Sequence, residues 1–339
     1  MVIVSERSEA NNVGFVRSEV RLGKITTFSM GLRQAFVLFV LTVQNTALVL
    51  ATKYTYRTGS AAYSSTTVVV CSEALKLFFS SAILVVHEGK RAAYSAIREV
   101  PSNTVSLMLP SVLYVIQNNL LFEGIKLLSP TMYMICSQSK IFTSALFSVL
   151  LLEVQLRQRQ VLSLVLLACG MVAVQYEEQR GAVLSRSHPV HTSTTLLGMS
   201  IVFIAAMISG FAGAYLERMY RVKQRSVWFR NTQLACFSLP IAFATAYVRD
   251  HTLFHSGNFF NGYDKIVVVV VLLQAVGGLV VAAVLRYAGN ILKCFAISIS
   301  ICNCAMATIM MDDSRDTNQI GVLLGVLTVI FSTFMYSAC

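Results

Sequence analysis

The sequence predicts an all-α membrane protein with ten transmembrane helices arranged as a five-plus-five inverted repeat. Three observations lead to this fold class. Hydrophobic residues make up 55% of the 339-residue chain and charged residues only 13%, about half the charged share of average soluble domains. The apolar residues form runs of about 20 residues, the length that a helix needs to cross a bilayer core. These runs are continuous rather than alternating, which argues against the strands of a β-barrel.

The apolar runs follow one another along the chain and are separated by short polar connections. A polar tail, residues 1–29, precedes the first run, and we expect it to be a disordered cytosolic segment. The first run is long enough to stay in the membrane as a span. Residues 30–339 then form one ten-helix domain with halves of about 31–176 and 196–338, and the connection at 87–103 is expected to be a polar loop. The expected spans are roughly 31–53, 63–86, 104–124, 130–152, 159–176, 196–217, 231–248, 266–286, 290–311 and 318–338.

The basic residues outside the spans set the expected orientation. Sixteen lysines and arginines fall on the side of the N-terminus and eight on the other side. Cytoplasmic loops carry the excess of Lys and Arg, so both termini are expected in the cytosol. Ten spans divide into two sets of five, so the second set would enter the membrane from the opposite side. Inverted repeats of this kind recur in secondary transporters, with the substrate near the midplane.

Composition and motifs exclude several other classes of protein. The net charge is +11, but the basic residues lie between apolar runs and form no basic stripe, so nucleic acid is not an expected partner. The eight cysteines have no metal-ligand spacing with histidine, so neither a metal nor another cofactor is expected. A P-loop is absent, and Glu73 is the one clearly intramembrane acid. The sequence therefore argues against an enzyme and against a proton pump.

Three lysines lie inside the expected spans: Lys76, Lys140 and Lys293. A lysine near the centre of a span costs about 2.5–3.5 kcal/mol on insertion scales, so it usually faces a cavity or a partner. Lys140 falls in the fourth span and Lys293 in the ninth, which are equivalent positions in a five-plus-five repeat. Both would then point to one place, where an anionic substrate such as a pyrophosphate would relieve their repulsion. The alternative is that Lys293 snorkels to the cytosolic surface.

Other polar residues in the spans extend the candidate site. Glu73 lies one helical turn before Lys76, so a local ion pair and a role in the site both remain open. Asn118 belongs to a run of three amides, 117–119, which point in three directions, so at least one should reach a polar space. Tyr133 lies two turns before Lys140 on the same face. It would stack on a planar base while the lysine binds phosphate, or serve as an interfacial aromatic residue.

A small-residue motif bears on assembly. Gly321 and Gly325 have the spacing that lets a second helix approach closely. Either a neighbouring helix of the same chain or a second protomer would fit this face, so a homodimer is one expectation.

Five stretches of the sequence carry a family resemblance. They are YSSTTVVVCSEALK at 63–76, PSVLYVIQNNLLF at 110–122, SGFAGAYLE at 209–217, WFRNTQ at 228–233 and GGLVVAAVLRYAGNILKCFAIS at 277–298. These stretches resemble the nucleotide-sugar transporters of the UDP-galactose, UDP-N-acetylglucosamine and CMP-sialic acid group, within the drug/metabolite transporter superfamily. The resemblance runs from the first to the tenth span in the same order.

The resemblance implies ten helices in an inverted repeat and residence in Golgi or endoplasmic reticulum membranes. It also implies exchange of a cytosolic nucleotide sugar for a lumenal nucleoside monophosphate. By matched position it adds Asn231, of the Trp-x-Arg-Asn motif, and the neighbouring Gln233 to the site. The substrate-binding residues that it implies are Lys76, Asn118, Tyr133, Lys140, Asn231, Gln233 and Lys293.

Departures from the family pattern bear on the substrate. The chain reads SQSK at 137–140, where relatives commonly have an aromatic residue, and Val280-Val281 where CMP-sialic acid carriers tend to have Tyr-Thr. The run YAGNILKCF at 287–295 is closer to the UDP-galactose carriers, although Gly289 replaces their usual Asp. We expect an antiporter that exchanges UDP-galactose or UDP-N-acetylglucosamine for UMP. The alternatives are a CMP-sialic acid carrier, a carrier of broad specificity, a membrane-embedded glycosyltransferase-type enzyme, and a transporter of drug-like amines with an acidic cavity.

Overall fold

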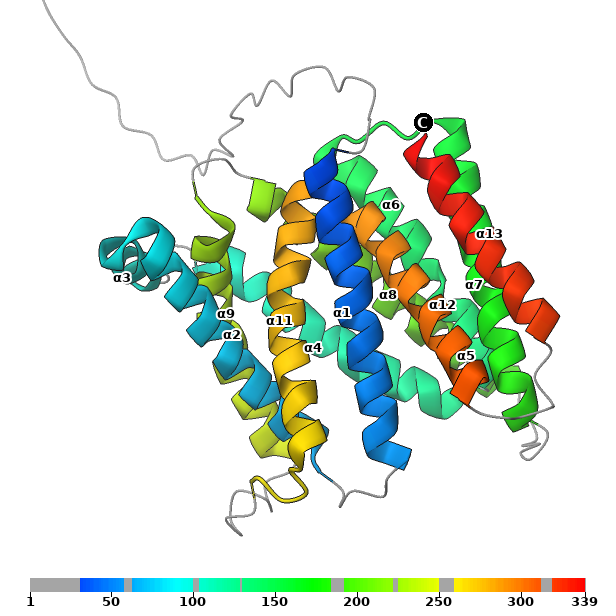
Figure 1. Ribbon diagram of the computed structural model, residues 1–339, viewed down its shortest axis with the longest axis horizontal. Coiled ribbons are helices and arrows are strands. Elements are labelled where there is room, and N and C mark those ends of the chain that lie inside the picture. Colours follow the sequence, from blue (N-terminus) through cyan, green and yellow to red (C-terminus); the bar gives the residue numbers. More distant parts are fainter. Residues whose placement is uncertain are drawn as a thin grey trace, which may run out of the picture.

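The computed structural model (Figure 1) describes residues 31–57, 63–99, 104–128, 130–183, 192–221, 225–249, 259–311 and 319–338. Within these ranges the regular structure is helical, with no strand. The predicted disordered tail, residues 1–29, lies outside the described residues. The helices are α1 (Leu32–Arg57), α2 (Ser65–Glu88), α3 (Lys90–Arg98), α4 (Thr104–Leu127), α5 (Pro130–Ser137), α6 (Ser139–Leu152), α7 (Gln158–Val183), α8 (Thr192–Arg221), α9 (Val227–Arg249), α11 (Lys265–Tyr287), α12 (Asn290–Met311) and α13 (Gln319–Ser337).

Eight segments of the described chain are long and apolar enough to cross a membrane. They lie in α1, α2, α5 with α6, α7, α8, α11, α12 and α13. The predicted all-α membrane class is therefore confirmed. The other two predicted spans correspond to α4 and α9, which are 24 and 23 residues long and each contain a proline, Pro110 and Pro240. The count of ten spans and the inverted repeat remain predictions.

Large apolar side chains cover the outside of the bundle as well as its interior. Phe39 on α1, Phe78 on α2 and Phe334 on α13 are mostly exposed. Many other large apolar side chains of the described residues are exposed as well, which is unusual for a soluble protein. The largest interior cluster joins α1, α6, α7, α11, α12 and α13 around Leu41, Ile141 and Phe295. Apolar residues on both sides of the same helices are the pattern expected of spans that face lipid on one side and protein on the other.

Glycines allow particular helix pairs to approach closely. A Cβ on Gly325 of α13 would lie 2.7 Å from Val174 Cγ2 and 3.1 Å from the carbonyl oxygen of Gly170, both on α7. A Cβ on Gly321 would meet the Glu177 side chain, again on α7. The small-residue motif thus packs against a neighbouring helix of the same chain.

The two ends of the bundle domain lie on one side. The start of α1 and the end of α13 lie at the same end of the bundle (Figure 1), which agrees with an even number of crossings.

The segment 87–103, predicted to be a polar loop, contains the helix α3 instead. Ala92, Ala93 and Ala96 share one face of α3 and pack with Leu84 of α2 and Phe229 of α9. The alanines supply too little hydrophobicity for a short helix to stand out in the sequence.

Candidate functional site

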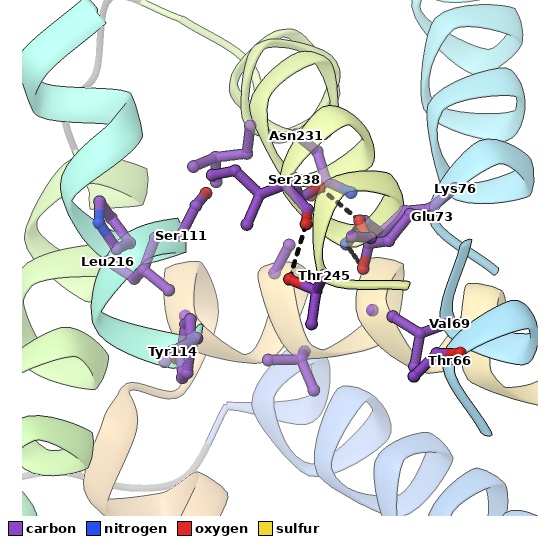
Figure 2. A pocket seen from close by; sticks show the side chains of 18 of the residues that line it. Thr66, Val69, Glu73, Lys76, Ser111, Tyr114, Leu216, Asn231, Ser238 and Thr245 are labelled. Atoms are coloured by element: carbon purple, nitrogen blue, oxygen red, sulfur yellow. Dashed lines mark hydrogen bonds and ion pairs between the residues drawn. The ribbon is translucent and has the colours of Figure 1, made fainter. Parts of the chain in front are cut away.

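A cavity of about 650 Å³ opens between α2, α4, α8, α9 and α11 (Figure 2). Its volume lies within the range of small-molecule binding sites, about 300–1,000 Å³. Apolar residues make up much of its wall, and a few polar groups converge on it. The polar residues in its middle part are Glu73, Lys76, Ser111, Tyr220, Asn231 and Ser238.

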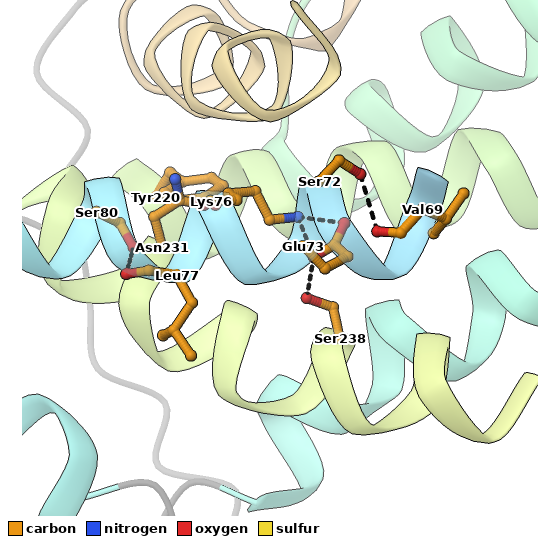
Figure 3. Close-up of polar contacts among 9 residues, drawn as sticks. All are labelled: Val69, Ser72, Glu73, Lys76, Leu77, Ser80, Tyr220, Asn231 and Ser238. Atoms are coloured by element: carbon orange, nitrogen blue, oxygen red, sulfur yellow. Dashed lines mark hydrogen bonds and ion pairs between the residues drawn. The ribbon is translucent and has the colours of Figure 1, made fainter. Parts of the chain in front are cut away.

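Lys76 and Glu73 form an ion pair at the wall of this cavity (Figure 3). The Lys76 ammonium lies 2.7 Å from Oε1 and 2.5 Å from Oε2 of the Glu73 carboxylate. On the opposite helix, α9, the hydroxyl of Ser238 donates a hydrogen bond to the same carboxylate. Gly278 of α11 leaves room for the lysine, because a Cβ there would lie 2.8 Å from Lys76 Cδ. The local ion pair left open by the sequence is therefore present, and it lines the cavity.

Asn231 is held in the cavity wall by a neighbouring tyrosine. The hydroxyl of Tyr220, on α8, donates a hydrogen bond of 3.1 Å to Asn231 Oδ1. Both side chains are buried. The Asn231 amide nitrogen, Nδ2, makes no hydrogen bond within the described part of the chain. Because the tyrosine occupies the carbonyl end of this amide, the two N–H donors of the amide are the groups without a partner among the described residues.

The cavity is asymmetric along the bundle. Toward one end it extends to Ser65 at the start of α2 and Arg249 at the end of α9. Toward the other end, which we call the closed end, Leu216, Tyr220 and Leu285 are buried in a hydrophobic cluster that joins α4, α8, α9 and α11.

A polar contact reinforces the closed end of the cavity. The Arg286 guanidinium, at the end of α11, donates to the backbone oxygens of Tyr220 at 3.2 Å and of Arg225 at 2.8 Å. With the predicted orientation, this closed end faces the cytosol.

Lys140 and Lys293, 153 positions apart in the sequence, lie on α6 and α12, two helices that pack against each other. Lys140 is the second residue of α6, which begins just after Gln138. Lys293 lies in the first turn of α12 and is half-buried, whereas Lys140 is exposed. The charge of Lys293 acts on Lys140, and that of Glu217 acts on Lys293. That both lysines point to one place stays a prediction.

Glu217 is a buried carboxylate that the sequence analysis did not identify as intramembrane. It lies in the last turns of α8 and is only 2% exposed. Its Oε1 is 2.6 Å from Arg221 Nη2, and its Oε2 accepts a hydrogen bond of 2.7 Å from the backbone N–H of Asn290. Gly289, at φ +93°, permits this contact because a Cβ there would lie 2.8 Å from Glu217 Oε1. The spacing of four residues between Glu217 and Arg221 is a sequence signal that could have revealed this pair.

The remaining predicted site residues have different surroundings. Tyr133 is half-buried on α5 and faces Gly124 of α4. Asn118 lies on α4, and its side chain is outside the described atoms. Gln233 is fully buried, where its Nε2 donates to the Ala96 backbone oxygen at 3.3 Å and its Oε1 accepts from Arg230 at 3.1 Å. The cavity around Lys76 thus includes Asn231 but not Tyr133, Lys140, Gln233 or Lys293.

The sequence profile of the family described as nucleotide-sugar transporters matches residues 31–337. The chain belongs to this family. A member of the nucleotide-sugar transporter family is a multi-pass membrane transporter and not an enzyme, as the sequence predicted.

Characterised relatives cover almost the whole chain. A UDP-N-acetylglucosamine/UDP-N-acetylgalactosamine transporter of Caenorhabditis elegans is 36% identical over 88% of this chain and 91% of its own length. A UDP-N-acetylglucosamine transporter of Rattus norvegicus is 37% identical over 88% of this chain and 93% of its own. A UDP-galactose transporter of Schizosaccharomyces pombe is 34% identical over 88% and 86%.

The fold of the nucleotide-sugar transporter described here also matches a solved crystal structure. The two superpose with a TM-score of 0.63 over 89% of this chain and 96% of the other, at 14% sequence identity. At this identity the match supports the fold alone.

Proposed function

We propose that this nucleotide-sugar transporter is an antiporter that exchanges a cytosolic UDP-sugar for lumenal UMP. UDP-galactose and UDP-N-acetylglucosamine are the favoured substrates, because the relatives at 34–37% identity carry these two names or that of UDP-N-acetylgalactosamine. The observation that carries the proposal is that α6 and α12, the helices of Lys140 and Lys293, pack against each other. Charged side chains within transmembrane helices mark substrate pathways, and two neighbouring ammonium groups would suit a multiply charged anion.

The proposed division of roles follows from the chemistry of each group. Lys140 and Lys293 hold the phosphates, with Tyr133 close enough along α5 to stack on the base. Asn231 offers its free amide donors to a carbonyl or phosphate oxygen from the cavity wall. Lys76 supplies a third cation, which Glu73 neutralises in the described arrangement. Asn118 stays in the proposed site because it lies on α4, one helical turn after Tyr114, which lines the cavity.

Gln233 has a different role in this proposal. Both ends of its amide are engaged, by α3 on one side and by Arg230 on the other. We assign it to the junction between α3 and α9, where it fixes the helix that carries Asn231.

The packing of the helices supports the five-plus-five repeat as part of the same proposal. In such a repeat α1 corresponds to α8, α2 to α9, α4 to α11, α5 with α6 to α12, and α7 to α13. The contacts agree with this exchange, since α4 packs on α8 as α11 packs on α1, and α6 packs on α8 as α12 packs on α1. Two helices also pack directly on their own counterparts in the other half, α2 on α9 and α7 on α13. Alternating access would then rock one half against the other around a midplane site.

The proposed location is the Golgi or endoplasmic reticulum membrane, with both termini in the cytosol. The location is the one that the resemblance to nucleotide-sugar transporters implies. The orientation rests on the distribution of basic residues. With this orientation the described cavity extends toward the lumen.

A CMP-sialic acid carrier or a carrier of broad specificity is the alternative within the family. Val280 and Val281 argue against the first, as an apolar pair stands where those carriers tend to have Tyr-Thr. A transporter of drug-like amines would need a free carboxylate in the cavity. Glu73 lines the cavity, but Lys76 and Ser238 already bind its carboxylate.

The proposal is tested by reconstituting the purified protein in vesicles preloaded with UMP and offering a panel of labelled nucleotide sugars. We expect UDP-sugars to enter faster than CMP-sialic acid, and entry to accelerate with UMP inside because a loaded carrier returns faster than an empty one. Vesicles without UMP but with a pH gradient serve as the comparison. Accumulation that follows the pH gradient and ignores UMP would rule out the antiport.

A further inference from the structure

The outer face of α3 carries a cluster of cations around two exposed apolar side chains. Lys90, Arg91 and Arg98 are exposed, and Tyr94 and Ile97 between them are 68% and 55% exposed. At helical spacing these five residues share one side of α3. The three cationic side chains make no ion pair or hydrogen bond to any other described residue.

The opposite face of α3 is already used inside the protein. Ala92, Ala93 and Ala96 pack with Leu84 and Phe229. The helix is therefore fixed to the bundle by its alanine face, and its basic, partly apolar face points away from the protein. Figure 1 shows α3 beyond the end of α2, to one side of the bundle.

This outer face continues the lipid-facing surface of α2. Phe78 and Val86, eight residues apart on α2, are 65% and 81% exposed, and Gly89 with φ +86° then turns the chain into α3. A helix that leaves the end of a transmembrane span in this way, with Lys and Arg beside an aromatic and an aliphatic side chain, has the composition of an interfacial helix. Among nearby carboxylates, Glu88 is exposed and Glu99 is paired with Arg225 at 2.7 Å.

We propose that the outer face of α3, formed by Lys90, Arg91, Tyr94, Ile97 and Arg98, binds the headgroups of anionic lipids in the leaflet of the membrane that the protein spans. The apolar pair enters the acyl boundary while the three cations meet phosphate and carboxylate groups. The proposal rests on the membrane assignment and is independent of which nucleotide sugar is carried.

Lipid bound at α3 is linked to the substrate cavity by direct contacts. Ala96 accepts a hydrogen bond from Gln233, two residues from Asn231 in the cavity wall. Glu99 binds Arg225, whose backbone oxygen accepts from Arg286 at the closed end of the cavity. An anionic lipid that holds α3 in place therefore also stabilises the closed end of the cavity.

Trp228, the only tryptophan of the chain, packs on the inward face of α3. A reporter on the outer face is therefore made by Tyr94→Trp together with Trp228→Phe, and this reporter chain, with its basic residues unchanged, serves as the wild type below. The full-length protein is reconstituted in phosphatidylcholine vesicles that contain brominated phosphatidylserine or, at the same fraction, brominated phosphatidylcholine. Bromine quenches tryptophan on contact. We expect brominated phosphatidylserine to quench the tryptophan at position 94 several-fold more efficiently, since each basic side chain near an anionic surface favours it by about fivefold.

The matched variants separate this surface from other basic residues. The triple variant Lys90→Gln, Arg91→Gln, Arg98→Gln should quench equally with the two lipids. The double variant Arg157→Gln, Arg159→Gln, in the connection between α6 and α7, should keep the wild-type preference. A second measurement does not depend on the folding of the triple variant. The wild type is also measured at about 1 M salt, where the Debye screening length falls to about 3 Å and the preference should disappear.

Three results would overturn the proposal. The first is equal quenching of the wild type by both lipids. The second is a preference for phosphatidylserine that survives in the triple variant. The third is a preference that is lost to the same extent in the Arg157 and Arg159 variant, which would indicate a general charge effect. None of these outcomes depends on transport, so a failure of the proposed antiport leaves the lipid proposal testable.

Discussion

The Tyr220 hydroxyl on α8 donates to the carbonyl oxygen of Asn231 on α9, 3.1 Å away, and fixes which end of that amide remains available. If Asn231 donates to substrate, Tyr220 acts as a positioning residue. Tyr220→Phe should raise the dissociation constant of UMP by about 2- to 12-fold, the range of one hydrogen bond worth about 0.5–1.5 kcal/mol. Asn231→Ala should raise it further. Titration calorimetry of the purified variants measures both, and an unchanged constant in both variants would remove Asn231 from the site.

The ion pair of Lys76 with Glu73 can be separated from substrate binding by a double-mutant cycle. Lys76→Ala leaves a carboxylate without its cation, which is destabilising for a partly buried pair. Glu73→Gln in the same chain removes that charge, so the double variant should recover thermal stability relative to Lys76→Ala. It should not recover UMP affinity, because the cation is still missing. Full recovery of affinity in the double variant would show that Lys76 acts only by neutralising Glu73.

Lys140→Ala and Lys293→Ala should each nearly abolish transport and UMP binding while the protein still inserts. Removing a lysine lowers the cost of insertion, so loss of folding is not the expected cause. UMP at 100 times its dissociation constant should stabilise the wild type by about 2.7 kcal/mol, and a thermal-shift assay should show no such gain in either variant. Arginine at either position should not restore the UMP-induced stabilisation, since a planar guanidinium group then replaces a compact ammonium group.

Arg159→Ala is the matched control for these lysine variants. Arg221, although it ends a helix near the surface, is unsuitable because it pairs with the buried Glu217. A normal UMP-induced shift in both lysine variants would favour the snorkelling interpretation of Lys293 and leave Lys140 without a phosphate role.

Gly325→Leu should destabilise the contact between α7 and α13 without changing the site. Even a Cβ at this position lies 2.7 Å from Val174 Cγ2, so a larger side chain forces the helices apart. Overpacking of this kind costs about 1–3 kcal/mol. We expect a lower melting temperature in detergent and an unchanged UMP dissociation constant. If instead the monomer–dimer ratio alone changes, the glycine face mediates contact between protomers.

Epitope tags at the two ends should both be accessible after the plasma membrane alone is permeabilised. The prediction follows from the excess of Lys and Arg on one side of the membrane. It also follows from Figure 1, in which the start of α1 and the end of α13 lie at the same end of the bundle. A lumenal C-terminus would mean an odd number of spans and would also refute the five-plus-five repeat.

Local patterns in the sequence predicted the features that depend on neighbouring residues. The apolar runs predicted the membrane class, and the spacing of Glu73 and Lys76 predicted their ion pair. The packing of α6 on α12, the helices that carry Lys140 and Lys293, joins distant parts of the sequence, which no local pattern reveals. Ser238 escaped notice because its partner, Glu73, lies 165 positions earlier, and a serine in an apolar run carries no signal of its own.

Burial at the end of a helix depends on what packs over it, which the sequence does not show. Glu217 falls at the edge of the predicted span 196–217, where a carboxylate would usually be solvated. The α12 N-terminus and Gly289 cover it instead. The amide of Gln233 binds α3, a helix that the sequence did not reveal, and its predicted contact with substrate stays a prediction.

The pairing of Glu217 with Arg221 has an electrical consequence for the transport cycle. Among six charged groups assigned to the region of the proposed site, Glu73 is paired with Lys76 and Glu217 with Arg221, which leaves the two positive charges of Lys140 and Lys293 as a surplus. A nucleoside monophosphate carries about two negative charges near neutral pH, as does the diphosphate bridge of a UDP-sugar. The loaded carrier is then close to neutral, whereas the empty carrier would have to move its surplus charge through a medium of low dielectric constant. Reorientation without cargo should therefore be slow and voltage-sensitive, and exchange of one nucleotide for another should be electrically silent.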